Sequence, residues 1–340
     1  MRLRLVCALL YVVLIVAHRV QKGSMSLTTD VRHNDVDVCT NPRRCDQKCE
    51  NREGSYKCSC HEGFHLMKRD NEEVPSRCHA EGVDPILLLC DESVITQTDL
   101  KNTEKSTYLT GTRSTAGSMD FHISNQMLIW SSLLFEQIFM CVIGPVAQEN
   151  KLTVECNDRD LKLLVQGADS VFGLAIDWIH NLLYWTHYRL HTISVMDLHT
   201  NHRLTLFTFE IDTPRDIVVD PKKGFLFWTS SGIKTKIERC GMDGLYRRVI
   251  HSGTKMIWPI GLALDMLDER LFWIDGTGSI YSSDYNGGDI DQLLHSKLYL
   301  PRPFSLTVFE DRIFYADWTI QAVNSVNKVS LNHPISTIHL

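Results

Sequence analysis

The stretch Gly173-Leu174-Ala175-Ile176-Asp177, followed after a short turn by Leu183-Tyr184-Trp185-Thr186, decides the fold because its pattern recurs along the chain. Similar pairs of segments occur at 217–220 with 226–229, 261–265 with 271–275, and 305–309 with 313–317, and a weaker copy joins Met119-Asp120 to 128–132. The aligned aromatic positions are 55, 43, 45 and 42 residues apart: Trp130, Trp185, Trp228, Trp273 and Tyr315. Short strands at this period predict a repeated four-stranded sheet, each burying one face on the next.

Turn residues support an all-β fold over residues 80–340. Gly224, Asp243-Gly244 and Asn286-Gly287 separate the expected strands. Pro214, Pro259 and Pro303 precede expected inner strands, where a missing N–H is tolerated. Long amphipathic helical windows are absent from the sequence. Because Asp177, Asp220 and Asp265 recur at the same place in each unit, we interpret them, like the tryptophans, as structural residues.

These segments resemble the YWTD class of six-bladed β-propellers in the low-density-lipoprotein-receptor family. Four stretches carry the resemblance, at 173–180, 214–221, 236–239 and 303–311, and it extends over roughly residues 35–340. The family's Asp after Thr is replaced by Ser132, His187 and Ser230, which indicates a divergent propeller. The long first interval predicts an insertion within 133–160. Relatives complete the sixth blade with a segment beyond the position of Leu340, so we expect a propeller that is incompletely closed.

The N-terminal residues are typical of a signal peptide. Arg2 and Arg4 precede an apolar run at 5–17, which is too short to span a bilayer of ~30 Å but suits a signal-peptide core. We therefore assign 1–23 to a signal peptide and 24–34 to a short linker, with an uncleaved anchor as the alternative. The expected location is the secretory pathway, either secreted or as a cell-surface ectodomain.

Six cysteines lie within forty residues, at positions 39, 45, 49, 58, 60 and 78. Such a cluster behind a signal peptide predicts a disulfide framework rather than a zinc site, although spacing alone permits fifteen pairings. The segment at 54–60 and Glu62-Gly63-Phe64 resemble the EGF-like family, so we assign 35–79 to an EGF-like domain. That resemblance implies three pairs: Cys39–Cys49, Cys45–Cys58 and Cys60–Cys78.

The remaining cysteines downstream are Cys90, Cys141, Cys156 and Cys240, and their pairing is open. Cys141 and Cys156 flank the expected insertion. They either bridge it or are free buried thiols.

The EGF-like domain also raises the question of calcium. Calcium-binding members of the family carry acids before the first cysteine and an Asp or Asn after the third, positions held here by Asp35, Asp37 and Asn51. Such oxygen ligands suit Ca²⁺. Val38 stands where the family has Glu or Gln, so we expect a weakened site. A plain EGF-like domain with solvated acids is the alternative.

The sequence favours binding over catalysis. It contains no G-x-S-x-G, H-E-x-x-H or P-loop motif, and its net charge of −6 without a basic stripe argues against nucleic acid. The resemblance implies the extracellular part of an endocytic receptor for a lipoprotein, with yolk-protein or apolipoprotein ligands, and a propeller that helps release them in acidic endosomes. Histidine titrates in that range, and His180 and His187 are the candidates for sensing pH.

Three forms of this function stay open: a fragment of a larger receptor, a secreted truncated relative, or an extracellular scaffold resembling nidogen. A calcium-dependent propeller hydrolase is a further alternative. It would need acids or histidines that converge at one end of the central channel.

Overall fold

The computed structural model of the chain describes most of its residues. These are 11–15, 39, 45, 47–52, 55–67, 77–80, 86–91, 94–100, 106–111, 116–122, 124–148, 151–156, 160–253, 256–320, 322–328 and 335–339. This part contains strands and turns but no α-helix, so no helix within it could cross a membrane. The prediction of an all-β chain is confirmed.

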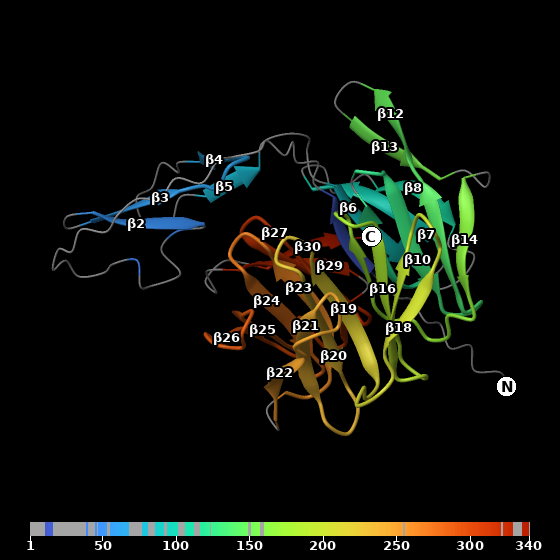
Figure 1. Cartoon of the computed structure of the whole chain (residues 1–340). Helices are drawn as coiled ribbons and strands as arrows, with labels where there is room; N and C mark the ends of the chain where they lie inside the picture. Colours follow the sequence, from blue (N-terminus) through green and yellow to red (C-terminus); the bar gives the residue numbers. More distant parts are fainter. Residues whose placement is uncertain are drawn as a thin grey trace.

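Six four-stranded antiparallel sheets form the blades of a propeller (Figure 1). Blade 1 contains β1 (Tyr11–Ile15), β6 (Ile86–Asp91), β7 (Val94–Asp99) and β8 (Ser106–Gly111). Blade 2 contains β9 (Ala116–His122), β10 (Met127–Ser132), β11 (Gln137–Val142) and β14 (Leu161–Gln166). Blade 3 contains β15 (Leu174–Asp177), β16 (Leu182–His187), β17 (Thr192–Asp197) and β18 (Arg203–Phe207).

The last three blades follow the same order along the chain. Blade 4 contains β19 (Pro214–Asp220), β20 (Phe225–Ser230), β21 (Lys236–Gly241) and β22 (Arg248–Ser252). Blade 5 contains β23 (Pro259–Asp265), β24 (Arg270–Asp275), β25 (Ser279–Asp284) and β26 (Asp291–His295). Blade 6 contains β27 (Pro303–Phe309), β28 (Arg312–Asp317), β29 (Ala322–Asn327) and β30 (Ser336–His339).

The repeated aromatic residues form the core between the blades. Each lies on the second strand of its blade opposite an apolar residue of the inner strand, as in the pairs Leu174–Trp185 and Ile217–Trp228. All five are buried: Trp130, Trp185, Trp228, Trp273 and Tyr315. Because both faces of each sheet meet a neighbouring blade, the second strands are mostly apolar and bury almost every side chain.

The inner strands form a ring around a central channel. β1 contacts β27 on one side and β9 on the other, so the ring is closed at blade 1, where we expected incomplete closure. β1 lies within the segment assigned to a signal peptide. The same apolar, β-branched run suits both a signal-peptide core and an inner strand, and the signal peptide stays a prediction.

The register corrects the first copy of the repeat. Met119 pairs with Trp130 as Leu174 pairs with Trp185, so His122, not Asp120, occupies the place of Asp177. Aligning Asp120 with the repeated acids was therefore wrong. The spacing misled because an unrelated acid lies two residues earlier on the same strand.

The long first interval contains an extra hairpin, β12 (Gly144–Gln148) and β13 (Lys151–Glu155), inserted between β11 and β14 (Figure 1). A disulfide joins Cys141 to Cys156 and closes the base of this hairpin. Both the insertion within 133–160 and the bridging alternative are confirmed. Cys90 and Cys240 are buried thiols.

The cysteine-rich module contains β2 (Lys48–Arg52), β3 (Ser55–Ser59), β4 (Phe64–Met67) and β5 (Arg77–Ala80), and lies to one side of the propeller (Figure 1). Its disulfides are Cys39–Cys49, Cys45–Cys58 and Cys60–Cys78, as the resemblance implied.

Candidate protein-binding site

The propeller has two ends that carry different side chains. We call proximal the end with the turns between first and second strands, at 178–181, 221–224, 266–269 and 310–311. The distal end has the turns between second and third strands and the connections between blades. Backbone hydrogen bonds join these two kinds of distal loop, for example from Ser231 N to Thr213 O at 3.2 Å and from Trp318 N to Arg302 O at 3.0 Å.

The repeated acids shape the proximal turns. Asp220 accepts the N–H groups of Lys222 and Lys223 at 3.0 and 3.1 Å, and Asp177 and Asp265 cap their own turns in the same way. All three carboxylates are buried. Each is therefore engaged in structure, and no free acid of this set is available for catalysis at this end.

The second oxygen of two of these acids reaches the next blade. Asp220 Oδ2 accepts the hydroxyl of Tyr285 at 3.0 Å, and Asp265 Oδ2 lies 2.6 Å from Lys328 Nζ. The nearby Asp268 also binds this buried ammonium, at 3.0 Å. Burial lowers the pKa of Lys328, but the two carboxylates outweigh that effect and hold it above its usual value. These contacts lock neighbouring blades together.

The EGF-like module meets the propeller at the proximal end. Glu310, in the first turn of blade 6, accepts the N–H of Ala80 at 2.8 Å with one oxygen, and its other oxygen lies 3.2 Å from His79 Nδ1. His61 of the module lies near the acids Asp265 and Asp268, although burial lowers its pKa. The module therefore covers part of the proximal end, and none of these contacts involves the distal end.

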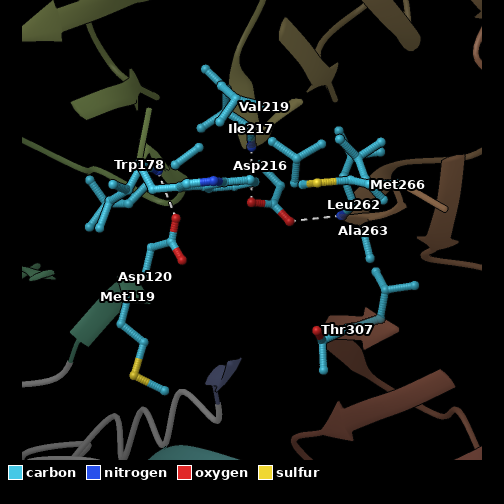
Figure 2. A pocket seen from close by; sticks show the side chains of 16 residues that line it. Met119, Asp120, Trp178, Asp216, Ile217, Val219, Leu262, Ala263, Met266 and Thr307 are labelled. Atoms are coloured by element: carbon cyan, nitrogen blue, oxygen red, sulfur yellow. Dashed lines mark hydrogen bonds between the residues drawn. The ribbon is translucent and has the colours of Figure 1, made fainter. Parts of the chain in front are cut away.

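A cavity of about 200 Å³ opens along the inner strands (Figure 2). Apolar residues line most of it, but the carboxylates of Asp120 and Asp216 both point into it from different blades. Burial raises the pKa of Asp120 to about 6 and that of Asp216 to about 7. Among the described residues that line it, none is a histidine, cysteine or lysine. The described lining therefore places no nucleophile or cation of the kind that most acid–base sites combine with carboxylates beside the pair.

Exposed apolar side chains gather at the distal end. Ile233 is 98% exposed, Phe209 81% and Trp258 59%, and these three come from consecutive loops of blades 3 to 5. Further exposed members of the same end are Leu134, Phe135, Leu190, Ile257, Leu298 and Tyr299. We call this set the distal apolar face. Exposed apolar side chains at one end of a molecule make that end a candidate for protein interaction.

The loops of the distal apolar face are held in place by specific contacts. Arg247 donates to the carbonyls of Phe209 and Glu210 while its guanidinium also binds the buried Glu238 at 3.0 Å. Trp258 has a φ of 52°, a conformation that large side chains rarely adopt. The loops of the distal apolar face are therefore preorganised.

The two histidines proposed as pH sensors lie at opposite ends of blade 3. His180 is at the proximal end, exposed, with Nδ1 2.6 Å from Asp177 Oδ2. His187 is at the distal end of β16, buried, and its Nε2 accepts the indole N–H of Trp185 at 2.7 Å. Burial lowers the pKa of His187. The structure does not bring the two together, and only His187 is near the distal loops.

For calcium, the described part of the module shows one of the three expected ligands. Asn51 lies on β2, and its Oδ1 accepts the N–H of Cys39 at 3.0 Å, which places the amide beside the start of the module. Asp35 and Asp37 lie outside the described residues. Within the described part of the chain, no three acidic, His or Cys side chains cluster as metal ligands would. Hard oxygen donors at this end of the module fit Ca²⁺ in type.

Sequence reasoning missed the distal apolar face and the channel acids. Phe209, Ile233 and Trp258 lie in loops, where polar residues are expected. Their apolar character at loop positions could have been noticed in the sequence. Asp216 interrupts the apolar pattern of an inner strand and was equally readable. What the sequence could not show is that loops of three blades converge.

Comparison with known proteins agrees with this architecture. Residues 35–78 match the family described as calcium-binding EGF domain, and residues 181–221 match the low-density lipoprotein receptor repeat class B. The match to one class B repeat therefore follows the match to an EGF-type module along the chain. The resemblance to the low-density-lipoprotein-receptor family is thereby confirmed, as is the six-bladed propeller expected from it.

Curated relatives point the same way. The chain is 29% identical over 318 residues to the vitellogenin receptor Yl of Drosophila melanogaster, covering 91% of this chain and 15% of that protein. It is 31% identical over 163 residues to a human low-density lipoprotein receptor-related protein 5-like protein, covering 48% of this chain and 64% of that one. The chain thus spans less than two thirds of either relative.

A solved structure shares the fold. The propeller in the nidogen/laminin complex superposes with a TM-score of 0.64 at 22% identity, over 75% of this chain and 93% of that chain.

Proposed function

We propose that this chain is the ligand-binding or ligand-releasing propeller portion of a lipoprotein-receptor-like ectodomain, that it is not an enzyme, and that its distal apolar face contacts a protein ligand. The observation that carries the proposal is the gathering of exposed apolar side chains on braced loops at the end opposite the EGF-like module. A vitellogenin-type yolk lipoprotein is the first ligand to test, because a curated relative is a vitellogenin receptor.

The contacts of the acids support a non-catalytic role. The repeated carboxylates cap turns, and two of them also bind the next blade. Each carboxylate of the channel pair accepts two backbone N–H groups. These hydrogen bonds give the carboxylates structural roles, within turns and between blades.

Calcium in this proposal belongs to the EGF-like module. Asp35, Asp37 and Asn51 would hold the ion, which would stiffen the start of the module. The match to calcium-binding EGF domains and the position of the Asn51 amide support this assignment.

Direct binding measurements test the function. The whole chain is immobilised and exposed to purified insect vitellogenin, to an apolipoprotein-containing lipoprotein and to laminin, at pH 7.4 and pH 5.5, with calcium and with EDTA. We expect vitellogenin to bind at neutral pH with calcium and to dissociate faster at pH 5.5. Laminin binding alone would favour the scaffold resembling nidogen, and binding of none of the three would contradict the proposal.

A further inference from the structure

The two carboxylates of the central channel sit in an unusual environment. Asp120 on β9 and Asp216 on β19 face the same cavity, whose other lining side chains include Leu174, Ile217 and Leu262 (Figure 2). Among the described residues that line the cavity, only Asp120 and Asp216 are ionisable. Two like charges in such surroundings disfavour the ionised state.

Each carboxylate also joins two blades. Asp120 accepts the N–H of Phe121 on its own strand at 2.7 Å and that of Ile176 on blade 3, also at 2.7 Å. Asp216 accepts the N–H of Ile217 at 2.9 Å and that of Leu262 on blade 5 at 2.7 Å. The charge state of these groups therefore acts where inner strands meet.

Few charges face the pair. Arg215 precedes Asp216, but its guanidinium lies over the ring of Phe172, 5.4 Å from the centroid. Asp120 faces Asp216 with a like charge that further raises the pKa of Asp216, after the larger effect of burial. Desolvation is thus the dominant influence on both groups.

We propose that Asp120 and Asp216 form a proton-binding pair in the channel that stabilises the ring of inner strands when the surroundings become acidic. Protonation removes buried negative charge, while the carbonyl oxygen of each acid can keep its bond to the neighbouring blade. The propeller would then be held more firmly under acidic conditions, where the receptor-type function calls for ligand release. Proton binding by Asp120 and Asp216 does not depend on which ligand the propeller binds.

The sign of the effect follows from linkage. The folded chain holds the proton on Asp216 up to a pH of about 7, whereas the unfolded chain releases it near 3.8. Between these values the folded state binds more protons, so the contribution of this group to stability is present at low pH and lost as pH rises through about 7. Asp120 behaves in the same way up to about 6.

Thermal unfolding of the whole chain tests the pair through differences between variants. Asp216→Asn and Asp120→Asn keep an amide oxygen to accept the N–H groups but cannot ionise. Between pH 5.0 and pH 7.5 we expect the Tm relative to the unmodified chain to rise by roughly 4 °C or more in Asp216→Asn and by about half as much in Asp120→Asn. Effects of buried histidines cancel in this comparison. Asp289→Asn, at a largely exposed acid, is the control and should show no such change.

A second measurement uses the unmodified chain. Infrared spectra should show a protonated carboxyl band that grows between pH 7.5 and pH 5.0, and each Asn variant that folds should reduce it. The proposal is overturned if the Tm differences are the same at both pH values, or if the unmodified chain shows no such band. Because ligand binding is not measured, the outcome is separate from that of the proposed function.

Discussion

At the scale of single residues, the repeated acids show how one residue type serves two contacts. One oxygen fixes the proximal turn of its own blade, and the other is left for a donor on the next blade, as Asp265 does with Lys328. Where the donor is absent, as at Asp177, the exposed His180 of the same turn takes the second oxygen. Variation at this position therefore changes how firmly two blades are joined.

Lys328 offers the clearest test of such a joint. It is 7% exposed and neutralises both Asp265 and Asp268. Lys328→Met removes the cation and leaves the buried carboxylate of Asp265 and the partly buried one of Asp268, so we expect the free energy of unfolding to fall by about 3 kcal/mol. Urea denaturation at pH 7.5 measures this loss. Lys223→Met, which removes the exposed partner of Glu269, should leave stability nearly unchanged, and an equal loss in both variants would contradict this assignment.

His187 provides a second test at this scale, with the opposite dependence on pH from the channel acids. Its pKa is lowered by burial, so the unfolded chain binds the proton more readily and stability is lost as pH falls below about 6.5. His187→Ser, the residue found in blades 2 and 4, removes this loss but also removes the acceptor of Trp185. We expect the variant to be about 1 kcal/mol less stable at pH 7.5 and to differ less from the unmodified chain at pH 5.5. Denaturant unfolding at both values checks this. A gap that widens on acidification would be inconsistent with a neutral, buried His187.

At the scale of structural elements, the inserted hairpin of blade 2 depends on one covalent link. Cys141 lies near the end of β11 and Cys156 precedes β14, at a sequence separation of 15. The disulfide keeps the hairpin from pulling these two paired strands apart. The insertion is accommodated because it projects outward from the blade (Figure 1).

Removing this disulfide should weaken blade 2. The double variant Cys141→Ala with Cys156→Ala is expected to lose about 3 kcal/mol of stability, the usual value for a loop of this length. Thermal unfolding measures the loss. Cys240→Ala is the control, because burial raises the pKa of that thiol to about 12 and it acts only as a small apolar side chain. A loss no larger than the control's would show that the bridge is dispensable.

The elements themselves were largely readable from the sequence. The spacing of Trp185, Trp228 and Trp273 predicted the second strands of blades 3 to 5, because those residues recur with their flanking apolar pattern. The EGF-like pairing followed from the family resemblance, not from spacing. β1 could not be predicted as an inner strand, since it is distant in sequence from its partner β6 and its apolar run is also typical of a signal peptide.

The candidate site was less predictable than the fold. Loops at the distal end are not constrained by the repeat, and their convergence depends on how far each blade is rotated from the next. His122 shows the same limit on a smaller scale, because only the strand register revealed that it occupies the place of the repeated acid.

At the scale of the whole molecule, the EGF-like module and the propeller are joined at the proximal end. Glu310 is the central residue of this junction, binding both Ala80 and His79. Glu310→Ala should loosen the module without unfolding the propeller. Hydrogen exchange at the Ala80 amide should become faster by about an order of magnitude, matching the loss of one charge-assisted hydrogen bond. His79→Gln, which removes only the side-chain partner, should have a smaller effect; unchanged exchange in Glu310→Ala would argue against this junction.

The central claim is that the distal apolar face binds a protein ligand, and two substitutions in one blade test it directly. Ile233 lies in the distal turn of blade 4 and Tyr246 in the turn between its outer strands, and they are 98% and 89% exposed. Neither change should affect folding, because both side chains are in solvent. The measurement is the affinity of the whole chain for purified vitellogenin at pH 7.4 with calcium. The account predicts that Ile233→Asp weakens binding at least about tenfold, as for a residue at the centre of an interface, while Tyr246→Asp leaves it unchanged. Equal affinity in the two variants, or loss of binding only in Tyr246→Asp, would contradict it.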